Sequence, residues 1–375
     1  MTQTILRGGL VLDEKGAFER RDVVIEGDRF SDAAPAADAT VIDAENSWVI
    51  PGVYDAHNHI TYSDFHLEDR LRHTPQESAA LLATALTDTL RGGVLNLRDG
   101  GGADSELQNA VATGALAGPR LQISVDMIGM DVAGTPGGVE RAVEASLAKG
   151  AQWIKLIATA GSNTPADSVL ASNFSEREIR VAAELAAQGG ARLMVHTWGG
   201  DSLDWAVEYG AGSIEHGIYL DASQAARIAQ AGVTFVPTVR IYRDLRDWLL
   251  SGELSGVPLE RITDVIASHE DAVRTARDAG VSIAMGCDYT TPQQHGTNLF
   301  ELAALRRAGL SSAEVLLAAT RAGADLFSDP DGGVIATGKR ADAVLLAYDP
   351  ADAATFERTD VVRAVVKDGS PIALS

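Results

Sequence analysis

Eight short apolar runs recur between residues 49 and 285, separated by longer amphipathic stretches, and this alternation restricts the possible folds more than any other feature. The runs are Val49–Asp55, Val94–Leu97, Leu121–Val125, Trp153–Ile157, Leu193–Val195, Ser213–Ile214, Thr234–Val236 and Ser282–Met285. Short apolar runs of this kind are typical of buried parallel strands. Strand and helix alternating eight times predict an α/β chain that forms a (β/α)8 TIM barrel, with a doubly wound open sheet as the alternative.

The starts of three helices can be predicted between these runs. The segments 74–77, 175–178 and 311–314 each begin with Ser or Thr and have Glu three residues later. In such a capping box each side chain satisfies a free backbone N–H of the first helical turn. We therefore expect helices to begin at these three places.

The two ends of the chain lack the alternation. Residues 1–49 contain short candidate strands and turns, and residues 334–375 contain the apolar runs Ala343–Ala347 and Val361–Val366. We expect the two ends to combine into one small, discontinuous β-sandwich domain, with the barrel occupying residues 50–333.

Composition excludes several classes of partner. The formal net charge is −21, from 31 Lys and Arg against 52 Asp and Glu, which argues against nucleic-acid binding. No apolar run is long enough to span a membrane, and Cys287 is the only cysteine. We expect a cytoplasmic homo-oligomer that acts on a small molecule.

Residues with metal-binding or reactive side chains gather where the apolar runs end. They are His57, His59, Lys155, His196, His216 and Asp288. The C-terminal ends of barrel strands form the face on which active sites are built. Imidazoles and a carboxylate meeting there predict a metal site suited to Zn²⁺, with Mn²⁺ or Fe²⁺ as alternatives.

Lys155 lies inside the apolar run Trp153–Ile157, where an unpaired charge is costly. Burial beside cations would leave the amine neutral and nucleophilic. Such an amine can react with CO₂ to form a carbamate, which can bridge two metal ions. We therefore expect Lys155 to be carboxylated.

These residues resemble the motifs of the amidohydrolase superfamily over nearly the whole chain. The resemblance is carried by Pro-Gly-Val-Tyr-Asp-Ala-His-Asn-His at 51–59, Ile-Lys-Leu at 154–156, Val-His at 195–196, Ile-Glu-His-Gly at 214–217, Gly-Cys-Asp at 286–288 and the segment 338–346. It implies two divalent metal ions: one bound by His57, His59 and Asp288, the other by His196 and His216, with carboxylated Lys155 between them. Two such ions would share a water and lower its pKa, and Asp288 would serve as the general base.

Within the superfamily the chain resembles the prolidase-like amidases and carboxypeptidases most, through segments 96–101, 235–238 and 295–301. The resemblance implies cleavage of a small amide bond, in an N-acyl amino acid, a dipeptide-like molecule or a cyclic amide. A lactonase or phosphotriesterase with the same metal pair is the alternative, and a metal-free scaffold protein is a third possibility. We expect the following side chains to line the pocket: Arg98, Trp198, Tyr219, Arg240, Tyr242 and His295. His269, in a charged helical stretch, is expected at the surface.

Overall fold

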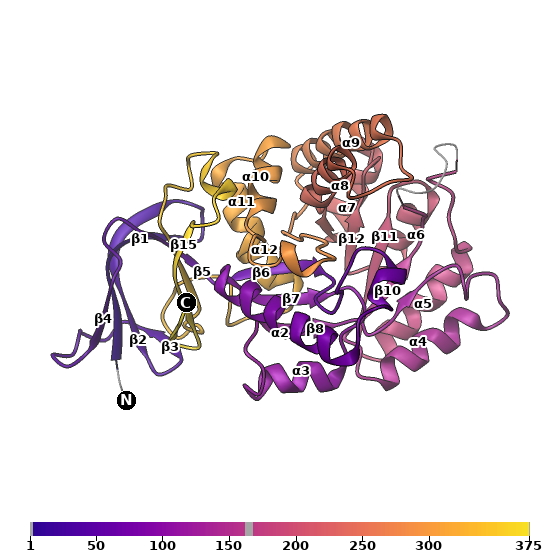
Figure 1. The fold of residues 1–375 in the computed structure, drawn as a ribbon. Helices are drawn as coiled ribbons and strands as arrows, with labels where there is room; N and C mark the ends of the chain where they lie inside the picture. Colours follow the sequence, from indigo (N-terminus) through magenta and orange to yellow (C-terminus); the bar gives the residue numbers. More distant parts are fainter. Residues whose placement is uncertain (1–2, 162–167, 375) are drawn as a thin grey trace.

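The computed structural model describes residues 3–161 and 168–374. Both ends of the chain lie in one sheet, on the left of Figure 1, and the strands and helices between them form the larger body. The strands of this terminal sheet are β1 (Gln3–Leu12), β2 (Phe18–Glu26), β3 (Arg29–Ser31), β4 (Thr40–Asp43), β5 (Trp48–Pro51), β14 (Ala343–Leu346), β15 (Val362–Lys367) and β16 (Ser370–Ile372). Strand β5 crosses the predicted domain boundary at residue 49.

The predicted β-sandwich is not confirmed, because these eight strands form one hydrogen-bonded path rather than two sheets. Their order is β16-β15-β14-β5-β1-β2-β3, and β4 pairs with β1. The ten-residue strand β1 pairs with three other strands of this sheet. Its register with β2 shifts between Leu6 and Gly9, and its other edge pairs with β4 over Thr4–Arg7 and with β5 at Leu10 and Val11.

The central strands are parallel, as the alternation predicted. They are β6 (Val53–Asn58), β7 (Val94–Asp99), β8 (Arg120–Ile123), β9 (Met127–Ile128), β10 (Trp153–Ile157), β11 (Arg192–Thr197), β12 (Ser213–His216) and β13 (Thr234–Val236). They form two ladders, β6-β7-β8 and β13-β12-β11-β10-β9. Parallel pairing brings their C-terminal ends to one side of the molecule.

The closed eight-stranded barrel predicted from the sequence is not present as a continuous ladder. The run Ser282–Met285 is not a strand and makes a single bridge, between Ile283 and Phe235 of β13. The reason lies in its hydrogen bonds, because the Met285 N–H donates to the Ala318 carbonyl of a helix and not to a strand. The run still lies beside β6, since the Met285 carbonyl accepts from the Ala56 N–H.

Helices follow most of the strands. They are α1 (Leu67–Arg70), α2 (Pro75–Arg91), α3 (Ser105–Ala112), α4 (Gly138–Ala148), α5 (Glu176–Gln188), α6 (Asp201–Glu208), α7 (Ala222–Ala231), α8 (Val239–Ser251), α9 (Leu259–Asp278), α10 (Phe300–Arg307), α11 (Ser312–Ala319) and α12 (Arg321–Leu326). The three predicted capping boxes are confirmed at the starts of α2, α5 and α11.

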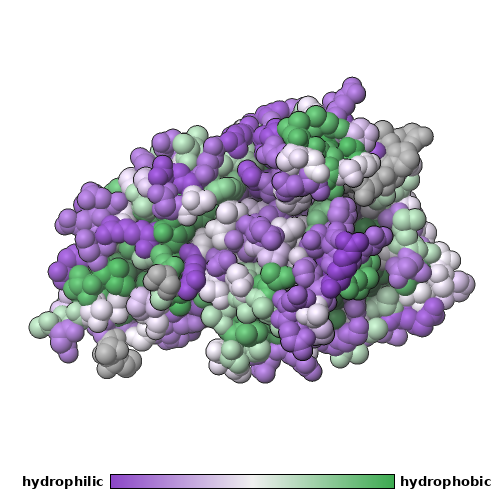
Figure 2. All heavy atoms as spheres, in the orientation of Figure 1, coloured by the Kyte–Doolittle hydropathy of each residue, from purple (hydrophilic) through white to green (hydrophobic). Residues whose placement is uncertain are grey.

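The face drawn in Figure 2 is largely hydrophilic, with an apolar area at the top, where Figure 1 draws α8 and α9. Leu250 of α8 is 64% exposed and Leu259 of α9 is 41% exposed. Among the described residues, no helix is both long and apolar enough to cross a membrane.

Candidate metal centre

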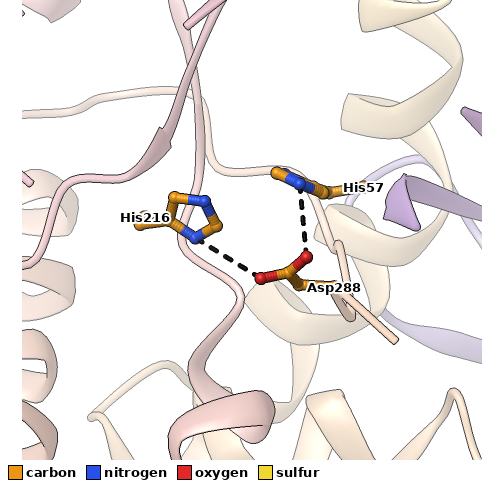
Figure 3. Close-up of side chains that lie close together, drawn as sticks. All are labelled: His57, His216 and Asp288. Atoms are coloured by element: carbon orange, nitrogen blue, oxygen red, sulfur yellow. Dashed lines mark ion pairs between the residues drawn. The ribbon is translucent and has the colours of Figure 1, made fainter. Parts of the chain in front are cut away.

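Two histidines and one aspartate meet at the C-terminal side of the central strands. Figure 3 shows the rings of His57 and His216 on either side of the Asp288 carboxylate. Donor atoms from these three side chains all lie within 4.8 Å of one another. The Asp288 Oδ1 lies 3.5 Å from His57 Nε2 and its Oδ2 lies 4.0 Å from His216 Nδ1. Such a group of imidazole and carboxylate donors can hold a divalent metal ion.

The backbone is strained where these side chains are presented. His216 at the end of β12, Thr238 just after β13 and Asp288 have φ angles of 69°, 57° and 56°. Non-glycine residues rarely adopt this left-handed conformation, which costs about 1–3 kcal/mol and is concentrated at functional sites. The surrounding packing must therefore hold the three residues in place.

His59 and Lys155 complete one side of the cluster. His59 Nε2 lies 3.3 Å from Asp288 Oδ1, and the two rings of His57 and His59 are 5.6 Å apart. The Lys155 Nζ of β10 is buried, 3.0 Å from His57 Nε2. Strands β6 and β10, which belong to separate ladders, thus bring the lysine to His57.

His196 on β11 lies beside His216 on β12, with ring centroids 4.5 Å apart. Its Nε2 atom is buried and has no hydrogen-bond partner among the described residues. An unpaired buried ring nitrogen is costly in a protein, and binding a metal ion would satisfy it. The donor set therefore fits the metal site that the sequence predicted.

Acceptors outside the cluster fix the histidine rings. His57 Nδ1 lies 2.7 Å from Glu215 Oε2, and His216 Nδ1 lies 2.7 Å from Thr238 Oγ1. When Nδ1 of a histidine donates to such an acceptor, the lone pair of Nε2 is left for a metal ion. Glu215 and Thr238 thus orient two rings toward the centre.

Arg98 is buried and contacts Glu215, the residue that bonds His57, rather than lining an open pocket. Its side chain is fully buried, donates from Nη2 to Glu215 Oε1 at 2.9 Å and from Nη1 to Ser213 Oγ at 2.8 Å, and stacks on the ring of Trp153. The guanidinium is occupied within the protein, so the geometry gives Arg98 a structural contact with Glu215 and no exposed surface for a substrate.

Asp55 connects His57 to Cys287, the residue before Asp288, through backbone hydrogen bonds. Its Oδ1 accepts from the N–H groups of His57 and Cys287, at 3.2 and 3.1 Å. Its Oδ2 accepts from the side-chain amides of Asn58 and Asn298, both at 2.9 Å. Burial raises the pKa of Asp55, and these four donors offset part of that cost.

Burial sets the protonation of the cluster. It lowers the pKa of Lys155 to about 8 and the pKa of His196 to about 3. Burial alone would raise the pKa of Asp288, but the nearby His57, His59 and Lys155 bring it down to about 2. The centre therefore combines an ionised Asp288 carboxylate with a neutral His196 imidazole, which is the state in which these groups bind metals.

Comparison with known proteins identifies the family. The model of the amidohydrolase family matches residues 48–372. The chain belongs to this family. It is 27% identical to ochratoxinase of Aspergillus niger, in an alignment 366 residues long that covers 86% of this chain and 75% of that protein. It is also similar to the imidazolonepropionase of Mycolicibacterium smegmatis, at 26% identity over 88% of this chain and 85% of that protein.

Solved structures agree. The crystal structure of a prolidase complexed with N-methylphosphonate-L-proline is 28% identical, has a TM-score of 0.88 and covers 99% of both chains. The crystal structure of A. niger ochratoxinase is 25% identical, with a TM-score of 0.84, and the match covers 99% of this chain and 95% of that one. The predicted resemblance to the prolidase-like amidohydrolases is confirmed, and the protein is a hydrolytic enzyme that acts on C–N bonds.

Three aromatic residues predicted to line the pocket of this amidohydrolase lie together beside His216. The Tyr242 ring is 6.4 Å from the His216 ring, and Trp198 is 5.8 Å from Tyr242 and 6.2 Å from Tyr219. Tyr219 is 36% exposed, whereas Trp198 is 1% exposed. The three aromatic rings lie side by side, with Tyr242 next to His216.

Arg240 lies on a cavity of about 660 Å³ that is also lined by Asp244, Trp248, Gln294 and Phe300. Its guanidinium pairs with Asp244 at 2.5 Å, and Gln294 donates to the other Asp244 oxygen. The residues that line this cavity do not include the donor residues of the metal centre, and Arg240 follows Thr238 by two residues in the chain.

His295 contacts helix α2. Its Nδ1 is 2.9 Å from the Thr89 hydroxyl of α2, and burial lowers its pKa to about 4. The Nδ1 atom of His295 is therefore paired with a side chain of α2. Its Nε2 atom has no hydrogen-bond partner among the described residues.

The expectation that His269 is a surface residue is wrong. It is fully buried in α9, with its ring 5.3 Å from the ring of Tyr242. Helix α9 packs against α8 and α7, so the face of α9 that carries His269 is enclosed although charged residues flank it in sequence. Sequence reasoning also assigned no role to Glu215, whose position inside the apolar strand β12 is the same signal that drew attention to Lys155.

Proposed function

We propose that this amidohydrolase cleaves a small amide that carries a free carboxylate near the scissile bond, using two divalent metal ions. The observation that supports this most is the convergence of His57, His59 and Lys155 on Asp288, beside His196 and His216. A prolidase complexed with a proline phosphonate is among its structural neighbours, which favours a substrate of the same size.

In this proposal His57, His59 and Asp288 would hold the first ion, and His196 and His216 would hold the second. Zn²⁺ suits these ligands best, with Mn²⁺ and Fe²⁺ as alternatives. Lys155, as a carbamate formed when its neutral amine adds to CO₂ and releases a proton, would supply an anionic ligand to both ions. When bound, the ions make water more acidic and polarise the scissile carbonyl.

Asp288 moves the proton in this scheme. Its carboxylate accepts a proton from the attacking water as the water oxygen bonds to the carbonyl carbon. It then passes that proton to the leaving nitrogen as the C–N bond breaks. With a pKa of about 2, Asp288 is ionised and ready to accept the proton at neutral pH. Glu215 and Thr238 keep the histidine rings oriented while this occurs.

Arg240 is the candidate partner of the substrate carboxylate. A guanidinium can bind a carboxylate through two parallel hydrogen bonds. Its present partner Asp244 also bonds Gln294, so Asp244 keeps a partner when Arg240 turns to a substrate. Tyr242 and Tyr219 would contact the substrate, and Trp198 would narrow the pocket and disfavour bulky Xaa-Pro dipeptides.

Replacing Arg240 tests this assignment. We expect Arg240→Met to lower kcat/KM for carboxylate-bearing amides about tenfold or more and to change little for the matching carboxamides. Arg246→Met is the control, because Arg246 lies on the same helix and pairs with Asp247. If the wild-type enzyme hydrolyses neutral lactones or phosphotriesters faster than any carboxylate-bearing amide, the amidase assignment fails.

A further inference from the structure

Helix α8 begins without the usual cap. Its N-cap residue is Thr238, but the Thr238 side chain makes no capping hydrogen bond. The first N–H groups of a helix have no partners within the helix, and an N-cap threonine normally accepts from one of them. Here the Glu301 carboxylate of α10 accepts instead, from the N–H of Val239 at 2.8 Å and the N–H of Arg240 at 2.7 Å.

The Thr238 hydroxyl is therefore free for another contact, and it lies 2.7 Å from His216 Nδ1. Thr238, His216 and Glu301 are all buried. The left-handed backbone of Thr238, with φ of 57°, is rare for a β-branched residue. Two bonds from Glu301 on one side and the contact with His216 on the other hold Thr238 in this conformation.

We propose that Glu301 and Thr238 are positioning residues for the metal centre, with Glu301 acting through Thr238 on the ring of His216. This inference rests on the proposed function, in which His216 is a ligand. When the His216 Nδ1–H donates to the Thr238 hydroxyl, Nε2 is the ring nitrogen that would be left to bind a metal ion. Residues that orient a metal-binding histidine typically contribute about 10–100-fold to metal affinity.

Two variants of Thr238 test the contact, with Co²⁺ as the probe. Thr238→Val removes the hydroxyl and keeps the shape, whereas Thr238→Ser keeps the hydroxyl. We expect Thr238→Val to weaken binding of one Co²⁺ ion about 10–100-fold in a chelator competition and to change the visible absorption spectrum of the Co²⁺ protein. Thr238→Ser should restore both. An unchanged affinity and spectrum in Thr238→Val would overturn the proposal.

A double-mutant cycle tests whether Glu301 acts through Thr238. Glu301→Gln puts an amide N–H against a backbone N–H and should weaken the same ion in the wild-type background. It should add little to Thr238→Val, because the contact that it supports is already lost. Equal effects in the two backgrounds would overturn the relay. If Glu301→Gln does not fold, Glu301→Asp, which is too short to reach both N–H groups, takes its place.

Glu314→Gln is the matched control, since Glu314 also caps a helix, α11, but is distant in the fold from His216. It should leave the Co²⁺ spectrum and affinity unchanged. Failure of the proposed function gives a different result. If the metal centre itself is wrong, wild-type protein binds no Co²⁺ there, and if only the substrate is wrong, the effect of Thr238→Val on Co²⁺ persists. If the wild type binds two ions and Thr238→Val is indistinguishable from it, the proposed function stands and only this inference fails.

Discussion

Asp288 is the side chain on which the chemistry depends most. It lies 3.3 and 3.5 Å from the Nε2 atoms of His59 and His57, and 18% of its side chain is exposed, so a small molecule can reach it. Asp288→Asn keeps an oxygen that can bind a metal but loses the ability to accept a proton. We expect metal content to persist while kcat falls about 10²–10⁴-fold.

The control for this change is Asp271→Asn, an exposed carboxylate on α9 that should leave kcat unchanged. Turnover is measured at saturating substrate, and metal is measured by elemental analysis on the same samples. A full kcat in Asp288→Asn would show that another group moves the proton.

Lys155 gives the second prediction. Because it stands 3.0 Å from His57 inside a buried strand, we expect Lys155→Ala to lose the bridging ligand. Metal content should fall from two ions per chain to one or fewer, and activity should disappear. Short carboxylic acids at high concentration should restore part of both. Lys149→Ala, on the exposed end of α4, is the control. Two ions and normal turnover in Lys155→Ala would contradict the bridging role.

For single residues, the sequence indicates the candidate metal-binding side chains more clearly than the residues that hydrogen-bond to them. Lys155 and the histidines stand out because charged or polar groups inside apolar runs are costly and need a reason. Thr238 gives no such signal, since its role depends on a contact with a residue distant in the chain. Asp55 is a charged residue at the end of an apolar run, but its partner Cys287 is distant in the chain. His269 was misplaced because its burial comes from the packing of α9 on other helices.

At the scale of elements, the capping of α8 by α10 has a consequence for stability. Burial raises the pKa of Glu301 to about 8, with Asp55 raising it further and the two backbone N–H donors and Arg240 lowering it. The folded protein therefore holds a proton that the unfolded chain releases above a pH of about 4.5. Stability from this group is full below that pH and is lost as the pH rises through about 8.

We expect the free energy of unfolding of the wild type to fall more steeply with pH than that of Glu301→Gln between about pH 4.5 and 8. The difference in slope can reach about 1.4 kcal/mol per pH unit. Denaturant unfolding of the metal-free proteins at several pH values measures it. Parallel slopes for the two proteins would show that Glu301 does not hold the extra proton.

Predictions of helices and strands are confirmed where a pattern of residues close together in the chain determines the element. The capping boxes at α2, α5 and α11 depend on residues three positions apart, and their helices begin as predicted. The run Ser282–Met285 failed as a strand, because whether a short run pairs depends on neighbours far along the chain. One of its N–H groups bonds Ala318 at the end of α11 instead.

At the scale of the whole molecule, the family and the order of elements were predictable, since motifs spread from residue 51 to residue 346 fix them together. The arrangement of the terminal strands was not, because the pairing of β1 with β2, β4 and β5 needs long-range contacts. Homo-oligomerisation and a cytoplasmic location stay predictions. The central claim concerns the centre that the whole fold assembles: two metal ions that work as a pair.

A metal titration tests that claim most directly. Metal-free protein receives Zn²⁺ in steps, and hydrolysis of a carboxylate-bearing amide is followed together with bound metal. We predict that activity rises until two ions are bound per chain and then stops, since both sets of histidines and the bridging Lys155 are needed at once. Full activity at one ion per chain, or in protein without metal, would contradict the account.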